Sequence, residues 1–185
     1  MICAVPLSSE YARICGTCLT EKPPFSRVIS YGIYEGILSE AITQFKFHGL
    51  KRFSKILAKL VIGPGLPQTD GIIPVPLSLQ RLKERGFNQS LLIAKVISKE
   101  LKTPLFMDNL VKTKDTPPQI GLPAKERQHN LRNAFGVTGD IKDLRLLLVD
   151  DVVTTGSTIR ECSKVLMKAG AREVVALTLA RAGLM

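Results

Sequence analysis

The sequence contains no tryptophan, and aromatic residues make up only 5% of its 185 positions. Proteins that hold single-stranded nucleic acid by stacking its bases need several exposed aromatic side chains. This sequence offers few residues for such a stacking surface. Acidic residues are also scarce, because 16 Asp and Glu face 26 Lys and Arg and leave a formal net charge of +10. This charge attracts phosphorylated small molecules, nucleic acids and anionic membranes alike, and does not choose among them.

Long apolar runs are missing as well. No segment approaches the roughly 20 apolar residues that span a bilayer, and the N-terminus lacks the basic-then-apolar pattern of a signal peptide. We therefore expect a cytoplasmic protein without a membrane span. Hydrophobic residues still account for 45% of the chain, which argues against disorder and permits a substantial core. The chain is predicted to divide into a small N-terminal segment, residues 1–25, and one globular domain, residues 26–185.

The most informative stretch is residues 146–158, which read Leu-Leu-Leu-Val-Asp-Asp-Val-Val-Thr-Thr-Gly-Ser-Thr. Four aliphatic residues without a helical period predict a short strand buried on both faces. An amphipathic run over residues 159–169, followed by Gly170, predicts a helix after the loop. Asp150 and Asp151 then lie where the strand leaves the core, and ligands of open α/β sheets bind at the carboxyl ends of strands.

The loop between this strand and this helix suits a phosphate group. The first turn of a helix presents unpaired N–H groups and the positive end of the helix dipole. Gly156 allows the backbone to approach a ligand, and neighbouring hydroxyls add donors, from Thr154, Thr155, Ser157 and Thr158. Asp150 and Asp151 need other partners, either sugar hydroxyls or a divalent cation. Phosphate, polyol and metal together indicate a phosphorylated sugar.

Other interpretations of the stretch are weaker. A Walker B strand also ends in acidic residues, but no G-x-x-x-x-G-K-[ST] motif accompanies it. The acidic pair of a receiver domain lies near the start of the chain, whereas this pair lies near the end. An acidic turn that only caps a helix is the plain alternative. The whole thirteen-residue run resembles the loop that binds phosphoribosyl pyrophosphate (PRPP) in type I phosphoribosyltransferases.

Three of the four cysteines, Cys3, Cys15 and Cys18, lie in the first 25 residues. Cys15 and Cys18 form a C-x-x-C motif, the spacing at which two thiolates can share one zinc ion. With Cys3 the set is one ligand short of a four-cysteine site. A redox pair is less favoured because no strand–helix pattern of the thioredoxin type surrounds the motif, and reduced cysteines without a role are the plain alternative. Cys162 falls on the apolar face of the predicted helix and is expected to pack in the core.

Two further segments carry cations. Arg81 and Arg85 lie four residues apart, on one face if the segment is helical, and guanidinium groups match phosphate oxygens well; a solvated basic turn is the alternative. Residues 112–133 are polar and contain three prolines. The segment is too long for a loop that only connects two elements of a compact domain, so we expect an active-site lid. Its residues with the means to reach a ligand are Lys112, Lys114, Gln119, Arg127 and Asn130.

Shorter patterns complete a resemblance to the ComF family of phosphoribosyltransferase-like proteins. They are Tyr-Glu-Gly at 34–36, Phe-Lys-Phe at 45–47, Pro-Val-Pro at 74–76, Arg-Gly-Phe-Asn-Gln at 85–89 and Gln-Ile-Gly-Leu at 119–122. The resemblance covers the chain essentially from Cys3 onward. It implies a type I phosphoribosyltransferase fold, a central mostly parallel sheet flanked by helices with a lid or hood. It also implies an N-terminal four-cysteine zinc element and an association with DNA uptake during natural competence.

The resemblance implies binding of PRPP with Mg²⁺ and displacement at the anomeric carbon. Residues 154–158 would cradle the 5-phosphate, Asp150 and Asp151 would hold the ribose hydroxyls or metal, and Arg81 and Arg85 would meet the pyrophosphate. Two functions stay open: transfer of phosphoribose to an unidentified acceptor, or a competence factor that handles single-stranded DNA and uses the loop for binding or sensing. In the family a cysteine precedes the position of Cys3, so a zinc site is expected only with a longer N-terminus.

Overall fold

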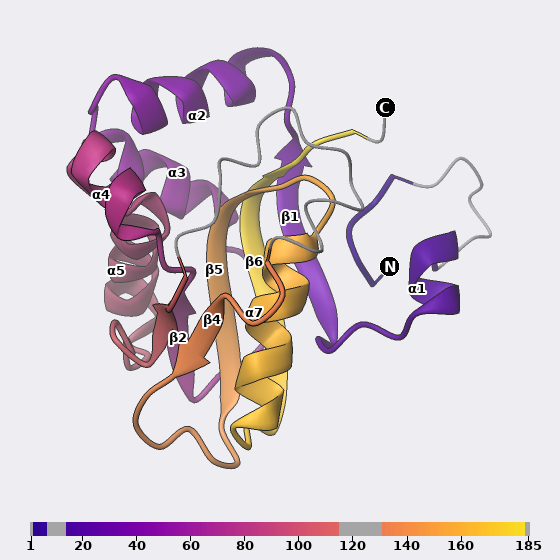
Figure 1. Ribbon diagram of the computed structural model, residues 1–185. Coiled ribbons are helices and arrows are strands. Elements are labelled where there is room, and N and C mark those ends of the chain that lie inside the picture. Colours follow the sequence, from indigo (N-terminus) through magenta and orange to yellow (C-terminus); the bar gives the residue numbers. More distant parts are fainter. Residues whose placement is uncertain (1, 7–13, 115–130, 184–185) are drawn as a thin grey trace.

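The computed structural model describes residues 2–6, 14–114 and 131–183. A four-stranded parallel sheet lies at its centre, in the order β1-β6-β5-β2 (Figure 1). Its strands are β1 (Arg27–Ile33), β2 (Gly71–Pro74), β5 (Arg145–Val153) and β6 (Glu173–Arg181). The long inner strands β5 and β6 are aligned from Arg145 opposite Glu173 to Val153 opposite Arg181. The parallel sheet and its burial on both faces agree with the aliphatic run that predicted it.

Side chains of β5 alternate between the two faces of the sheet. Leu146 and Leu148 pack with α7 (Ser157–Lys168) and with the small hairpin of β3 (Leu110–Lys112) and β4 (Phe135–Val137). Leu147 and Val149 pack on the opposite face, against α2 (Gly36–Phe47), α3 (Phe53–Val61) and α5 (Gln89–Leu101). Figure 1 shows these layers, with α7 and β4 in front of the sheet and α3 and α5 beside and behind it.

The Arg-Gly-Phe-Asn-Gln block forms the junction of two helices. Helix α4 (Leu79–Arg85) begins after Ser78, whose hydroxyl accepts a hydrogen bond from the N–H of Arg81, and ends at Gly86 with a φ of 73°. Asn88 then caps α5 by accepting a hydrogen bond from the N–H of Leu91. The same Asn88 side chain donates to the carbonyl of Val75 at 3.0 Å. This bond ties the junction to the carboxyl end of β2.

Some predicted boundaries are wrong. Strand β5 does not end before the acidic pair but continues through Asp150 and Asp151 to Val153, because β6 is equally long and offers ladder partners to the end. Helix α7 starts at Ser157, two residues early. The range 112–133 predicted for the lid is too wide, since Lys112 belongs to β3 and Leu131 is buried in the core, and residues 115–130 lie outside the described structure. Strands β3 and β4, which the sequence analysis does not assign, pair antiparallel.

The N-terminal segment lies against the edge of the sheet. The carbonyl of Ile2 accepts a hydrogen bond from the N–H of Val28 at 2.7 Å, and Ile2, Cys3 and Ala4 pack on the core. Helix α1 (Gly16–Thr20) follows Cys15 directly. Across the part of the chain that the structure describes, every helix is too short or too polar to cross a membrane.

Candidate functional site

The acidic pair lies near the carboxyl end of the inner strand β5. Asp150 is aligned with Thr178 of β6, and helix α5 packs against β5. The Ser90 hydroxyl, from the start of α5, donates to Asp150 Oδ1 at 3.0 Å, and the N–H of Asp151 donates to the same oxygen at 2.9 Å. Burial, followed by the charge of Asp151, raises the pKa of Asp150 to about 7.

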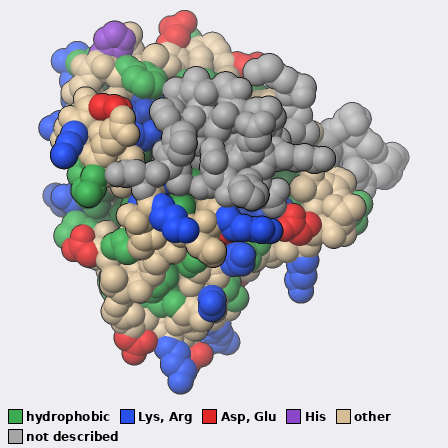
Figure 2. All heavy atoms as spheres, in the orientation of Figure 1, with side chains coloured by type: hydrophobic (Ala, Val, Ile, Leu, Met, Phe, Trp, Pro, Cys, Tyr) green, Lys and Arg blue, Asp and Glu red, His purple; other side chains and the backbone are tan. Residues whose placement is uncertain are grey.

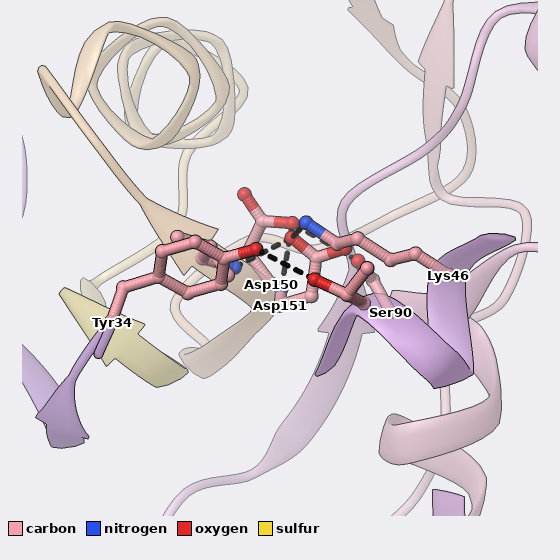
Figure 3. A network of polar contacts seen from close by, with 7 residues as sticks. Tyr34, Lys46, Ser90, Asp150 and Asp151 are labelled. Atoms are coloured by element: carbon pink, nitrogen blue, oxygen red, sulfur yellow. Dashed lines mark hydrogen bonds and ion pairs between the residues drawn. The ribbon is translucent and has the colours of Figure 1, made fainter. Parts of the chain in front are cut away.

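Asp151 has a different partner. The Lys46 ammonium, in the last turn of α2, lies 2.9 Å from Asp151 Oδ1, and their side chains are only 16% and 12% exposed. Figure 3 shows Lys46 of α2 and Ser90 of α5 meeting the two carboxylates. Tyr34 points toward the same group, and its hydroxyl shares a hydrogen bond of 3.2 Å with Thr43 Oγ1. The sequence interpretation did not assign Lys46 to the site. Its place in the Phe-Lys-Phe motif was the available signal, but the motif alone does not say which carboxylate the lysine meets.

Residues 154–158, which the sequence predicts to bind a phosphate and which we call the phosphate loop, lie at the junction of β5 and α7. Gly156 has a φ of 81°, a left-handed conformation that residues with a side chain rarely adopt, and it serves as N-cap of α7 without a side-chain capping bond. Thr155 Oγ1 and Ser157 Oγ lie 2.8 Å apart, and the N–H of Ser157 points at Thr155 Oγ1. Thr154 and Thr155 are exposed. An anion at this helix start would therefore meet backbone N–H groups and hydroxyls.

Arg181 lies beneath this loop. It is the last residue of β6, only 4% exposed, and its Nη1 is 3.9 Å from where a Cβ on Gly156 would stand. Its Nε finds no hydrogen-bond partner in the described structure. Burial lowers the pKa of this guanidinium, and the nearby cysteines oppose that effect. The sequence interpretation did not assign this arginine to the site.

The predicted pyrophosphate arginines lie on α4. Arg85 stacks on the Phe47 ring at 5.0 Å and is half-buried. Burial lowers its pKa, and the charge of Asp151 acts in the opposite sense. Arg81 is half-buried one turn earlier. Arg85 is thus electrostatically linked to Asp151, and its predicted contact with pyrophosphate stays a prediction.

The lid residues are only partly described. Lys112 lies in β3, with its Nζ 6.0 Å from the centre of the Phe135 ring. Lys114 is exposed just after that strand. Gln119, Arg127 and Asn130 fall within residues 115–130, outside the described structure. Their predicted contacts with the ligand therefore stay predictions.

The three N-terminal cysteines form one cluster. The Sγ atoms of Cys3, Cys15 and Cys18 all lie within 4.8 Å of one another, with Cys3 and Cys15 3.3 Å apart. Thiolates at about 2.3 Å from one zinc ion would be spaced about 3.8 Å apart, so the cluster fits a shared ion with a fourth position unfilled by the described residues. Burial and the neighbouring cysteines raise the pKa of Cys18 to about 12. Burial also opposes ionisation of Cys15, but hydrogen bonds from Cys18, Cys3 and Thr17 lower the pKa of that thiol.

Comparison with known proteins agrees with this arrangement. The phosphoribosyl transferase domain profile matches residues 88–183, which contain the acidic pair and the phosphate loop. Competence protein F of Haemophilus influenzae is 38% identical over 93% of this chain and 80% of its own length. DNA utilization protein YhgH of Escherichia coli is 34% identical over 97% of this chain and 82% of its own. Competence protein ComFC of Bacillus subtilis is 27% identical over 80% of this chain and 61% of its own.

The comparison with solved structures gives weaker likenesses. A purine phosphoribosyltransferase from Pyrococcus horikoshii has 22% identity and a TM-score of 0.39, over 82% of this chain and 77% of that one. The glutamine PRPP amidotransferase of B. subtilis has 23% identity and a TM-score of 0.45, over 69% of this chain and 25% of that one. On the profile match and the identity to competence protein F and YhgH, the chain belongs to the phosphoribosyl transferase domain family, in the group of the ComF homologues.

Proposed function

We propose that this protein binds PRPP and transfers its phosphoribosyl group to an acceptor. The observation that carries the proposal is the placement of two carboxylates and a glycine-containing helix start at the same end of the inner strand β5. A sugar phosphate has the matching pattern, hydroxyls on the ring and a phosphate at one end. The name of the domain family supports the same class of ligand.

Each part of the ligand has a counterpart. Residues 154–158 would hold the 5-phosphate, chiefly through the N–H groups of the first turn of α7. Asp150 and Asp151 would accept hydrogen bonds from the ribose hydroxyls, and their charge would favour the positive charge that develops on the sugar ring. Arg85, which interacts electrostatically with Asp151, would bind the departing pyrophosphate together with Arg81. Lys112 and Lys114 would add positive charge at the start of the proposed lid.

The proposed reaction is a displacement at the anomeric carbon. The bond from that carbon to the pyrophosphate oxygen breaks, and a bond to the nucleophilic atom of the acceptor forms. Pyrophosphate leaves with the bonding electron pair, and the acceptor loses a proton if it carries one. The loop and the acidic pair hold the two ends of the ribose during this exchange.

Mg²⁺ would enter with the pyrophosphate, whose charge it neutralises. The acidic pair itself does not fit a magnesium site, because Lys46 already lies on Asp151 while Ser90 and a backbone N–H lie on Asp150. Within the described chain the pair belongs to no group of three candidate metal ligands. We therefore assign Asp150 and Asp151 to the sugar and not to the metal.

Calorimetry with PRPP and Mg²⁺ tests the binding. We expect binding that ribose 5-phosphate weakens by competition and that inorganic pyrophosphate weakens less, because the loop recognises the 5-phosphate. A screen of nitrogen-containing acceptors for pyrophosphate release from PRPP then tests transfer. Binding without release for every acceptor would leave the protein a PRPP-binding factor, and absence of binding would end the proposal.

A second candidate function is binding of single-stranded nucleic acid. A cavity of about 360 Å³ lies between the segment after α1 and helix α7, next to the phosphate loop, lined by Glu21, Lys22, Pro24, Arg132, Ser157, Arg160, Glu161 and Lys164. Its four cations outnumber its two carboxylates, and Figure 2 shows Lys and Arg side chains gathered over the face of α7 and β4. Arg160 and Lys164 stand one helical turn apart, about 6 Å, close to the spacing of successive phosphates. The names of the relatives, in competence and DNA utilization, agree with such a ligand.

Titration of a fluorescent oligonucleotide against salt tests this candidate. Each phosphate contact contributes about 0.7 to the slope of log affinity against log salt for a single strand. Arg132→Ala and Lys164→Ala should each lower the slope by about that amount. The control, Lys99→Ala, removes an exposed cation from α5 on the other side of the sheet and should leave the slope unchanged. Equal slopes in all three variants would remove the cavity from consideration.

A further inference from the structure

Lys46 holds the position at the acidic pair that a metal ion would take. Its Nζ lies 2.9 Å from Asp151 Oδ1, and more than four fifths of each side chain is shielded from solvent. A shielded ion pair is screened less by water and salt than one on the surface. The pair therefore carries a cation before any ligand arrives.

The position of Lys46 is fixed by its two neighbours in sequence. Phe45 is fully buried and its ring lies 5.7 Å from that of Phe87. Phe47 lies under the guanidinium of Arg85 at 5.0 Å. Since both flanking residues are anchored to the Arg-Gly-Phe-Asn-Gln block, the fold itself orders the backbone that carries Lys46. The Phe-Lys-Phe motif thus delivers one ammonium group to one carboxylate.

We propose that Lys46 is a positioning residue that excludes divalent cations from the acidic pair and leaves its remaining carboxylate oxygens to the hydroxyl pair of a sugar. A divalent cation needs about six oxygen ligands, several of them from the protein or its ligand. Here Asp151 is neutralised by Lys46, while Oδ1 of Asp150 accepts from Ser90 and from a backbone N–H. Hydroxyl groups need only free acceptor lone pairs, which both carboxylates retain.

The preference for hydroxyls over metal follows from the charge count. With Lys46 present the pair and its ammonium sum to at most one negative charge, too little to attract a hydrated Mg²⁺ strongly. Without Lys46 two adjacent carboxylates would face one another, and a divalent cation would relieve their repulsion. The same lysine would hold Asp151 in one orientation for the ligand. The assignment of the hydroxyls rests on the proposed function, whereas the exclusion of metal does not.

Electron paramagnetic resonance of Mn²⁺ with the full chain, without PRPP, tests the exclusion. Wild type should show no Mn²⁺ bound at the acidic pair at submillimolar concentration. Lys46→Met should gain a site that binds Mn²⁺ at least tenfold more tightly, and Asp151→Asn in that background should abolish it. Lys46→Arg should behave as wild type. The control, Lys51→Met, removes a nearby ammonium that lies over the Phe87 ring and not on a carboxylate, and should gain nothing.

The outcomes separate the two parts of the inference. Two results would overturn the exclusion of metal. One is Mn²⁺ binding by the wild-type protein that the substitution Asp151→Asn removes, and the other is a Lys46→Met protein that binds Mn²⁺ no more tightly than wild type. Lys46→Gln replaces Lys46→Met if thermal melting shows that the latter is unfolded. In a second arm, ribose 5-phosphate should bind Lys46→Met about tenfold more weakly than Lys46→Arg. If neither form binds it while the Mn²⁺ result holds, the proposed function fails and the exclusion of metal stands.

Discussion

The side chain of Arg181 donates a hydrogen bond from Nη1 to the carbonyl oxygen of Cys3 at 3.3 Å, although 178 positions separate the two residues. The same Nη1 lies beneath Gly156 in the phosphate loop. One buried guanidinium therefore stands between the cysteine cluster and the loop. Negative charge on either side, from thiolates or from a bound phosphate, would be stabilised by the same cation.

Replacing Arg181 by Met is expected to weaken both sites at once. Phosphate-ester binding at the loop should fall about tenfold, and the affinity of the cysteines for Co²⁺ should fall as well. The free energy of unfolding should change by only about 1–2 kcal/mol, because an apolar side chain of similar size often replaces a buried charge at small cost. Calorimetry, cobalt absorption and urea unfolding measure the three quantities. The control, Arg172→Met, changes an exposed residue just before the opposite end of β6 and should alter none of the three. Unaltered ligand binding by the Arg181→Met protein would contradict the link.

The raised pKa of Asp150, about 7, predicts a pH dependence of stability. The folded protein keeps a proton that the unfolded chain releases above about pH 4, so this contribution to stability is complete below pH 4 and is lost as the pH rises through 7. Asp150→Asn should remove this loss of stability at rising pH, because asparagine does not titrate. Its stability relative to wild type should improve between pH 4 and pH 8 by on the order of 2 kcal/mol, since one pKa unit corresponds to about 1.4 kcal/mol and solvent screens a half-buried group.

Asp70 supplies the matched control for this measurement. Hydrogen bonds from Arg145 lower the pKa of Asp70, so its contribution to stability is present at neutral pH and is lost as the pH falls through the carboxyl range. Asp70→Asn should therefore lose stability relative to wild type as the pH rises, the opposite sign to Asp150→Asn. Urea unfolding at several pH values distinguishes the two slopes. Parallel behaviour of the two variants would show that Asp150 does not titrate as described.

Gly156 and Gly170 allow strain and ligand binding to be separated. They flank the two ends of α7, with φ values of 81° and 97°. Alanine at either position should destabilise the fold by about 1–2 kcal/mol, the usual cost of a left-handed backbone for a residue with a Cβ. Only Gly156→Ala should also weaken PRPP binding, and Gly156→Val should abolish it. Calorimetry with PRPP measures both effects, and equal PRPP affinity in the two glycine-to-alanine variants would make the loop a structural turn.

The hydroxyl of Thr155 is expected to contribute less than the backbone of the loop. Thr155→Ala should weaken PRPP binding by about 1–2 kcal/mol, as the loss of one hydrogen bond to a charged group does. The same calorimetry measures this loss.

The cysteine cluster predicts weak metal binding by this chain. Three sulfurs within 4.8 Å give one position fewer than a closed tetrahedral site. Cobalt titration should produce a thiolate charge-transfer band that Cys15→Ser removes and that Cys162→Ala, in the buried core, preserves. A form of the protein extended at the N-terminus by one more cysteine should bind zinc far more tightly. A band that survives Cys15→Ser would place the metal elsewhere.

Local patterns predicted the strand and the helix around residues 146–158 better than the contacts between distant residues. The aliphatic run, the acidic pair and Gly156 identified a strand, a loop and a helix start because each depends on neighbours in sequence. Lys46 and Arg181 escaped prediction because their partners, Asp151 and Cys3, lie more than 100 residues away. The extension of β5 through the acidic pair likewise depends on the length of β6, which no local pattern reports.

The strand order also governs the timing of folding. The outer strands β1 and β2 are synthesised early, yet each pairs within the sheet with β6 or β5, which are synthesised last. During synthesis on the ribosome, Arg27 cannot pair until Val175 has been made, and Gly71 cannot pair until Leu146 has been made. Pairings of such sequence separation make folding slow and leave strand edges open in the meantime. A nascent chain shorter than 145 residues therefore exposes β1 and β2 without their partners β6 and β5, and such exposed strands are bound by chaperones.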